Sequence, residues 1–337
     1  MTATAPAVAA EWQEWVARNL ALGVPPETLT DVLLDAGVDA AAARAEIEAA
    51  LAHPYLRACR SLAESYGWAE ALLETYGELR AADGGPVLER RHSLASGEFF
   101  ERYYFGHRPV VLRGLTDDWP ARRWTLAGLR ERFGTVPVEV MTGRDADAEH
   151  GWRYDAHRTT MPFGDYLTMV ETGGRTNDYY LVPRNEAWQR PGLAAMRAEV
   201  LPPAGLVPAD VAAEDMTLLL GPAGTVTPLH HDNMNILLCQ VVGRKHVRLV
   251  PSWDRHRVYP RGGTFSHVDA SSPDLGRFPD YADATVLEAV LEPGEALFIP
   301  VGWWHWVRAL DVSITVSFHR FTHPASAVYL RPGVDDA

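Results

Sequence analysis

Apolar positions in the first ~80 residues recur at three- and four-residue spacing. The segments EWQEWVARNLALGV, PPETLTDVLLDAGV and DAAAARAEIEAALAHPYL all show it, and the spacing is typical of amphipathic helices. Pro25 and Pro26 favour a helix start, and the run Gly-Gly-Pro at 84–86 interrupts the pattern. The pattern predicts two or three short helices and a longer one from about Pro54 to Leu79.

Further along the chain the pattern changes to short β-rich runs. RPVVLRG, VPVEVMTG and DYYLVP alternate with helical segments such as LASGEFFERYYF, TLAGLRERFG and MPFGDYLTMV. From Met216 strands dominate, and turns rich in Gly, Pro and Asp separate MTLLLGP, NILLCQVVG, KHVRLVP, ATVLEAVLEPGEALFIP and HWVRALDVSITVSFHRF. This order predicts an antiparallel double-sheet barrel.

These patterns predict a mainly β protein with helical additions (α+β), in three parts: a helical appendage at 1–85, a β domain at 86–325 and a C-terminal tail at 326–337. Five apolar residues at helical spacing are expected to form the appendage's own small core: Trp12, Trp15, Leu29, Leu33 and Ile47. As hypotheses, the appendage mediates formation of a homodimer or docks a substrate protein.

Composition narrows the class of protein. The 337 residues are 47% hydrophobic and 22% charged, without the roughly 18 to 20 uninterrupted apolar residues of a membrane helix. Cys59 and Cys239 provide neither a disulfide framework nor a zinc cluster, so we expect a cytoplasmic protein with no membrane partner. The net charge of −13 disfavours nucleic acid as a partner.

A short polar motif carries the first candidate chemistry. In TPLHHDN, His230 and Asp232 lie two residues apart, so on a strand both side chains leave from one face and His231 points the other way. His305 follows 73 residues after Asp232, in GEALFIPVGWWHWV. Two imidazoles and one carboxylate leave open positions on a metal, as in non-haem iron(II) sites. Other histidines fit neither the spacing nor the face and are interpreted as surface or structural residues: His246, His256, His267, His319 and His323.

Lys245 provides the second candidate feature. It lies 15 residues after His230, where Gly243 allows a turn and the chain can return as the neighbouring antiparallel strand. A buried ammonium beside a metal needs an anionic partner. The distal carboxylate of 2-oxoglutarate would supply one, whereas a solvated lysine at a hairpin is the alternative.

Two long segments resemble a known family. TPLHHDNMNILLCQVVGRKHVRLVPSWD and PGEALFIPVGWWHWVRALDVSITVSF look like the JmjC-type cupin hydroxylases, over about residues 88 to 321. The resemblance implies a double-stranded β-helix (jelly roll) that uses Fe(II), 2-oxoglutarate and O2. It implies iron ligation by His230, Asp232 and His305, and 2-oxoglutarate contacts from Lys245, Thr227 and Tyr180.

The sequence departs from that family at two positions. Protein hydroxylases of this type often carry asparagine six residues after the first histidine, where this chain has Ile236, with Asn233 and Asn235 nearby. Ser317 stands where some relatives have asparagine. Asp232 retains the carboxylate that a halogenating site lacks, which favours hydroxylation.

By resemblance we expect hydroxylation of a side chain in a protein or peptide. Four aromatic residues are candidates for the wall near the entrance: Trp152, Tyr179, Trp303 and Trp304. A free amino acid or a natural-product intermediate is the alternative small-molecule substrate. A non-oxygenase metal-binding cupin, either an isomerase or a binding module, would not need Lys245 and Thr227, and a tRNA-base hydroxylase fits poorly with the net charge of −13.

Overall fold

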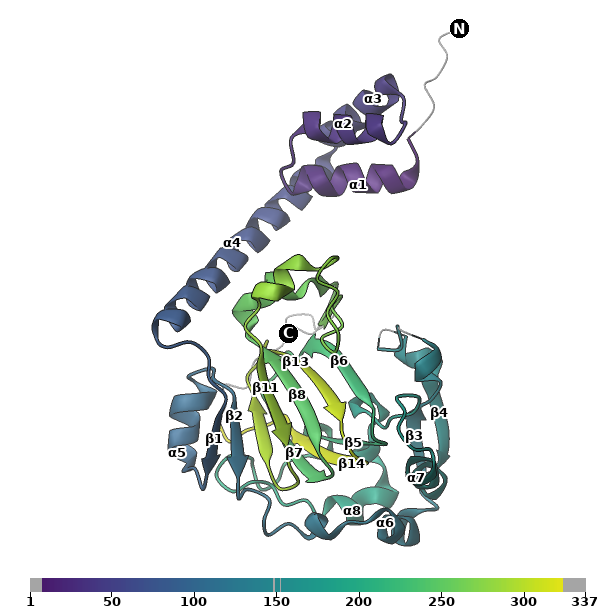
Figure 1. Ribbon diagram of the computed structural model, residues 1–337, viewed down its shortest axis with the longest axis vertical. Coiled ribbons are helices and arrows are strands. Elements are labelled where there is room, and N and C mark those ends of the chain that lie inside the picture. Colours follow the sequence, from purple (N-terminus) through teal and green to yellow (C-terminus); the bar gives the residue numbers. More distant parts are fainter. Residues whose placement is uncertain (1–7, 148, 152, 324–337) are drawn as a thin grey trace, which may run out of the picture. The chain divides into compact units, whose positions relative to one another are not determined.

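The chain folds as two units, Met1–Leu79 and Arg80–Ala337. The computed structural model describes residues 8–147, 149–151 and 153–323 (Figure 1). We predicted a boundary near residue 85; the long helix at Pro54–Ala82 spans the boundary between the units and ends before that residue. The predicted tail at 326–337 lies outside the described residues.

The N-terminal unit is helical, as the apolar spacing predicted. Its helices are α1 (Ala10–Ala21), α2 (Pro26–Asp35), α3 (Ala40–Ala52) and α4 (Pro54–Ala82). Pro26 begins α2, and the Asp39 carboxylate caps α3 by accepting from two backbone N–H groups. The small core contains the predicted Leu29, Leu33 and Ile47, whereas Trp12 and Trp15 are only partly buried and pack at its edge. Four further buried residues complete the core: Val16, Leu20, Ala43 and Leu56.

The second unit is built from fourteen strands within its described residues. They are β1 (Glu89–His92), β2 (Val110–Arg113), β3 (Pro137–Met141), β4 (Arg158–Pro162), β5 (Met216–Gly221), β6 (Val226–His231), β7 (Ile236–Val242), β8 (Lys245–Val250), β9 (Pro260–Arg261), β10 (Phe265–Ser266), β11 (Leu287–Leu291), β12 (Ala296–Ile299), β13 (Trp304–Ala309) and β14 (Ser313–Phe318). One six-stranded sheet has the order β1-β2-β12-β7-β14-β5 and the other β11-β8-β13-β6-β10-β9. The two sheets form the predicted double-stranded β-helix, which confirms the fold class.

Short helices accompany the sheets at one edge and one end (Figure 1). They are α5 (Ser96–Glu98), which continues into a π-helix at Phe99–Tyr104, α6 (Leu126–Phe133), α7 (Phe163–Thr172) and α8 (Ala194–Arg197). The run DYYLVP is not a strand as predicted. It makes only isolated bridges, from Tyr180 to Met141 and from Leu181 to Leu220, because its last residues turn into a 3-10 helix at Pro183–Asn185.

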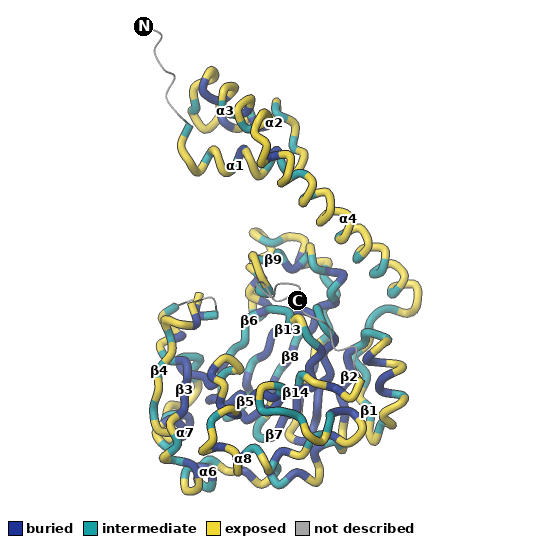
Figure 2. Tube along the Cα trace, turned by 180° about the vertical axis from the view of Figure 1, so that it is seen from behind, coloured by how far each residue is buried: buried dark blue, intermediate teal, exposed yellow. Residues whose placement is uncertain are grey.

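Successive side chains along each strand point alternately into the hydrophobic core and into the barrel interior. On β14, Val316 belongs to the large hydrophobic core that also contains the residues of α6 and α7, whereas Ser317 faces the interior. On β13, Trp304 and Trp306 pack in a second core on the outer face of the other sheet, and His305 faces inward. Figure 2 shows that β5, β7 and β14 of the first sheet are buried, whereas β6 of the second sheet is mainly half-buried. Among the polar interior residues, Lys245, His305 and Ser317 are nevertheless buried.

The turn from β7 to β8 passes from one sheet to the other. We predicted that Lys245 begins a strand beside β7, and this is wrong, because β8 pairs with β11 and β13. Gly243 makes the turn with φ of +68°, and Gln240 Nε2 donates to its carbonyl oxygen at 2.8 Å. The change of sheet carries Lys245 into the barrel interior.

Among the helices of the described chain, none has the length and apolar character needed to cross a membrane.

We predict that Gly243→Ala destabilises the second unit by about 2 kcal/mol or more, because an L-residue is strained at this φ. In addition, the new Cβ would lie 2.1 Å from the carbonyl oxygen of Val312. Urea denaturation measures the loss. Gly262→Ala is the matched control, since no atom lies within 4 Å of its Cβ position. Equal stability of the two variants would contradict the role of this turn.

Candidate functional site

Three side chains that are far apart in the sequence converge at one end of β6 and β13. His305 on β13 pairs directly with His230 on β6, and Asp232 follows just after β6. Asp232 Oδ2 lies 3.3 Å from His305 Nε2 and 3.8 Å from His230 Nε2. One ligating atom from each residue lies within 4.8 Å of the others. The structure thus brings together the predicted metal ligands.

Backbone carbonyls orient both imidazole rings. His230 Nδ1 donates to the carbonyl oxygens of Pro228, at 2.9 Å, and of His305, at 3.2 Å. His305 Nδ1 donates to the carbonyl oxygen of Trp303 at 3.1 Å. With the proton on Nδ1, each Nε2 carries a lone pair toward the shared space, which is the usual arrangement around a metal-ligating histidine.

The protonation states also fit a metal. Burial, with the nearby His305, lowers the pKa of His230 to about 4. Burial of Asp232 opposes its ionisation, but the adjacent imidazoles of His305 and His230 favour the anion and hold its pKa well below its usual value. At neutral pH, His230 is a neutral donor and Asp232 an anion, as metal binding requires. Two nitrogens and one carboxylate suit a divalent transition metal with open coordination positions.

A cavity of about 310 Å³ opens beside the three ligands and is lined by all of them. Aliphatic side chains from three strands, β5, β7 and β13, line much of it: Leu219, Ile236, Leu238 and Val307. Thr227 and Lys245 line it as well. The candidate metal site and the candidate carboxylate seat therefore share one space.

Lys245 is almost completely buried, with 1% of its surface exposed. Its Nζ donates to Tyr180 Oη at 3.1 Å, and no carboxylate pairs with it among the described residues. Tyr180 does not itself line the cavity, so the structure places it behind Lys245. Lys245 is also the only lysine in the chain, beside 30 arginines. That count is a sequence signal that the motif analysis did not use.

An irregularity in strand pairing brings Thr227 to the interior. His230 pairs with His305 and Thr227 pairs with Val307, so an advance of three residues along β6 is matched by only two residues along β13. Such a β-bulge reverses the alternation of side chains. Thr227 and His230 therefore both line the cavity although they are three residues apart. In a regular strand, side chains three residues apart would point to opposite faces of the sheet.

The aromatic wall predicted from the sequence is wrong for its described members. Tyr179 donates to the carbonyl oxygen of Met169, and Trp303 packs against Trp253. Trp304 neighbours His305 on β13 and therefore faces outward, where it packs against His231 at a centroid distance of 4.7 Å. Trp152 lies outside the described residues.

The cavity also contains residues that sequence analysis missed. His319, interpreted as a surface or structural residue, lines the cavity near Ser317, with its Nε2 3.3 Å from Ser317 Oγ. It follows β14, where alternation places it on the same face as Ser317. Ile236 also lines the cavity, whereas Asn235 accepts a hydrogen bond from the Val301 backbone at 2.8 Å.

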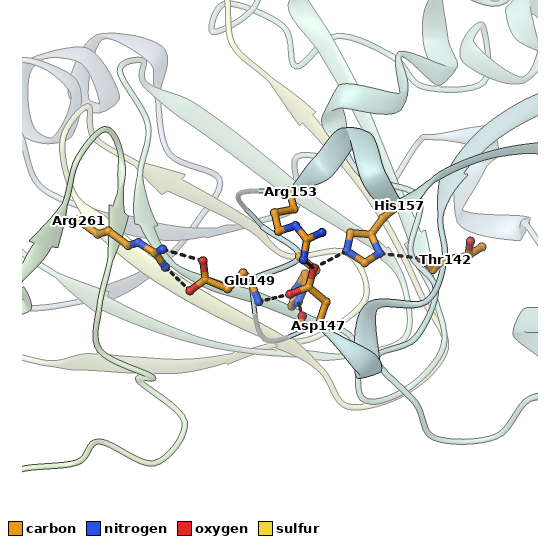
Figure 3. Close-up of polar contacts among 7 residues, drawn as sticks. Thr142, Asp147, Glu149, Arg153, His157 and Arg261 are labelled. Atoms are coloured by element: carbon orange, nitrogen blue, oxygen red, sulfur yellow. Dashed lines mark hydrogen bonds and ion pairs between the residues drawn. The ribbon is translucent and has the colours of Figure 1, made fainter.

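Residues 142–157, which we name the β3–β4 segment, form one wall of the cavity in their described part. Figure 3 shows how ion pairs hold this segment. Asp147 accepts from His157 at 2.9 Å and pairs with Arg153 at 3.2 Å. Glu149 forms two contacts of 2.6 Å with Arg261 on β9. Together these pairs position three cavity-lining residues: Arg144, His150 and Tyr154.

Comparison with known proteins agrees with the geometry. Residues 96–324 match the family described as a cupin-like domain. "Lysine-specific demethylase 8" of Xenopus tropicalis is 33% identical over 245 residues, covering 70% of this chain and 53% of that protein. "Lysine-specific demethylase JMJ30" of Arabidopsis thaliana is 33% identical over 249 residues, covering 68% and 54%. "HSPB1-associated protein 1" of Rattus norvegicus is 29% identical over 248 residues, covering 63% and 48%. The chain spans about half the length of the curated relatives it matches.

We predict that His230→Ala and Asp232→Ala each weaken binding of Mn(II) by about 100-fold or more, because each removes a ligand that no described neighbour replaces. Isothermal titration calorimetry at pH 7.5 measures the affinity. His231→Ala is the matched control, because this adjacent ring faces Trp304. Comparable weakening in all three variants would contradict the assigned ligand set.

Proposed function

This chain belongs to the cupin-like domain family, and from this membership we propose that it is an Fe(II)- and 2-oxoglutarate-dependent dioxygenase that hydroxylates an unactivated C–H bond. His230, Asp232 and His305 would hold the iron. Lys245 and Thr227 would bind the distal carboxylate of 2-oxoglutarate, with Tyr180 behind the lysine. The bound iron and co-substrate would supply the oxidising chemistry, which converts the substrate C–H group, O2 and 2-oxoglutarate into the hydroxylated product, succinate and CO2.

The observation that carries this proposal is a buried ammonium in the same cavity as the metal ligands. A buried charge without an anionic partner is costly, and the described residues offer Lys245 only the hydroxyl of Tyr180. A dianion that reaches both the metal and Lys245 satisfies both groups. A metal-dependent isomerase or a binding module would have no use for this lysine, so the non-oxygenase alternative is disfavoured.

The protein's own residues position the reactants and exclude water. The Nδ1 hydrogen bonds of His230 and His305 keep both Nε2 atoms directed at one point. The aliphatic wall that includes Ile236 and Leu238 limits the water beside that point, which strengthens every electrostatic contact within the cavity. Ile236 stands where related protein hydroxylases often have asparagine, so this wall has an aliphatic side chain at that position and no amide.

We propose an amino-acid side chain in a protein or peptide as the substrate. Two relatives carry the name lysine-specific demethylase, which favours an amino-acid side chain here. A free amino acid or a natural-product intermediate remains the alternative substrate. The cytoplasmic location and a homodimer are further proposals, drawn from the two cysteines and from the helical appendage.

We expect Lys245→Met to weaken binding of 2-oxoglutarate to the Mn(II)-loaded protein by about 30-fold or more, because a buried charge pair is lost. Thr227→Val should weaken it by about fivefold, since one hydrogen bond is removed. Calorimetric titration measures both effects. Arg244→Met is the control, because this neighbouring cation pairs with Asp311 at the surface. Unchanged affinity in Lys245→Met would refute the proposed seat.

A turnover assay tests the reaction itself. With Fe(II), ascorbate, 2-oxoglutarate and O2, we expect succinate release to be stimulated more by a peptide pool from cell lysate than by a pool of small metabolites. Mass spectrometry should then find peptides heavier by one oxygen atom. Stimulation by the metabolite pool alone would favour the small-molecule alternative, and no succinate with either pool would count against the oxygenase.

A further inference from the structure

A second buried cation lies in the wall of the cavity. Arg144, on the β3–β4 segment, has 3% of its surface exposed and lines the cavity. Its Nη2 donates to the Val226 carbonyl oxygen at 2.7 Å and contacts His150 Nε2 at 3.0 Å. Its guanidinium carbon lies over the Tyr180 ring at 5.2 Å from the centroid.

This guanidinium is only partly satisfied. Nε and Nη1 of Arg144 are buried and have no hydrogen-bond partner, and no ion pair to Arg144 occurs in the part of the chain that the structure describes. The nearby acids are otherwise engaged: Asp145 accepts from Thr176, and Asp178 accepts from the Asp145 backbone. Burial lowers the pKa of Arg144 to about 10, so the side chain stays charged at neutral pH. A buried cation of this kind calls for an anion from outside the chain.

The charges around the cavity indicate how many anions it takes. The described lining residues include the cations Arg144, Arg184 and Lys245, but Asp232 is their single carboxylate. A divalent metal adds positive charge, and 2-oxoglutarate brings two negative charges. One of its carboxylates is expected at the metal and the other at Lys245. Arg144 is then left without a counter-ion.

We infer that Arg144 binds a carboxylate of the prime substrate and so selects a carboxylate-bearing substrate. This inference rests on the proposed function and specifies its substrate class. The carboxylate belongs either to the side chain of an acidic residue in a peptide or to the α-carboxylate of an amino acid or chain end. Bidentate pairing of guanidinium with carboxylate provides both charge and orientation. A cationic methyl-lysine side chain would instead enter a cavity that is already positive.

Tyr180 contacts both buried cations. Lys245 Nζ donates to its hydroxyl at 3.1 Å and lies 5.7 Å from the ring centroid, and the guanidinium carbon of Arg144 lies 5.2 Å from the same centroid. Lys245 begins the barrel strand β8, whereas Arg144 comes from the β3–β4 segment. The two cations therefore come from different parts of the fold, which suits two different anions.

Paired probes that differ only in charge test the inference on the full chain loaded with Mn(II) and 2-oxoglutarate. N-acetylglutamate N-methylamide is compared with its glutamine analogue, and N-acetylleucine with N-acetylleucinamide. Saturation-transfer NMR and calorimetry measure binding. We expect at least one acid to bind about tenfold or more tightly than its amide, and the pair that shows the preference identifies the source of the carboxylate.

Variants assign that preference to Arg144. Arg144→Met should abolish it and Arg144→Lys should retain part of it, while both keep the wild-type affinity for 2-oxoglutarate. Arg184→Met is the matched control, since this exposed cavity arginine should leave the preference intact. Thermal unfolding shows whether each variant folds. If a variant does not fold, the comparison of acids with amides on the wild-type protein still tests the inference.

Three results would overturn the inference. The first is equal binding of acids and amides by the wild-type protein. The second is tighter binding of the acids that persists in a folded Arg144→Met variant. The third is a loss of 2-oxoglutarate affinity in Arg144→Met as large as in Lys245→Met, which would place Arg144 in the co-substrate seat. If the wild-type protein fails to bind 2-oxoglutarate, the proposed function itself is wrong, and this outcome is visible before any probe is added.

Discussion

The pairing of β6 with β13 is the contact on which the functional site depends. It sets His230 opposite His305 and places Asp232 within 3.8 Å of both Nε2 atoms. The strands also orient the rings: His230 donates to carbonyl oxygens of β6 and β13, and His305 donates to the carbonyl oxygen of Trp303, directly before β13. The same pairing contains the bulge that turns Thr227 inward. The pairing thus positions the candidate metal ligands together with Thr227 of the proposed co-substrate seat.

Burial of positive charge is the second constraint on this protein. Lys245 and Arg144 are both removed from water, and among the described residues neither has a carboxylate partner. Protein interiors tolerate such groups only where an anion or a metal-bound ligand compensates them. Under the proposed function, these two cations are preorganised to bind anionic reactants, at a cost in folding stability. The aliphatic wall of the cavity adds to this effect, because a low local dielectric strengthens the attraction.

The differences between the sequence-based predictions and the structure have three physical causes. Tryptophans near a ligand were expected at the entrance, yet Trp304 is adjacent to His305 on a strand and must face the opposite side. Lys245 was expected beside β7, but the short turn at Gly243 changes sheets instead of forming a hairpin. His319 and Arg144 have no motif around them, since they reach the cavity from a strand end and from a surface segment.

The sequence alone determined the helical appendage, the double-sheet barrel and the common strand face of His230 and Asp232, because periodicity and short motif spacing are local properties. His305, 73 residues after Asp232, was added to this pair from its segment GEALFIPVGWWHWV and from the family resemblance. The sequence also indicated that Lys245 needs an anion. Only the tertiary structure decided which residues share the cavity with them. Strand register, a bulge and a change of sheet depend on contacts between residues far apart in the chain, and these set which face of each strand lines the cavity.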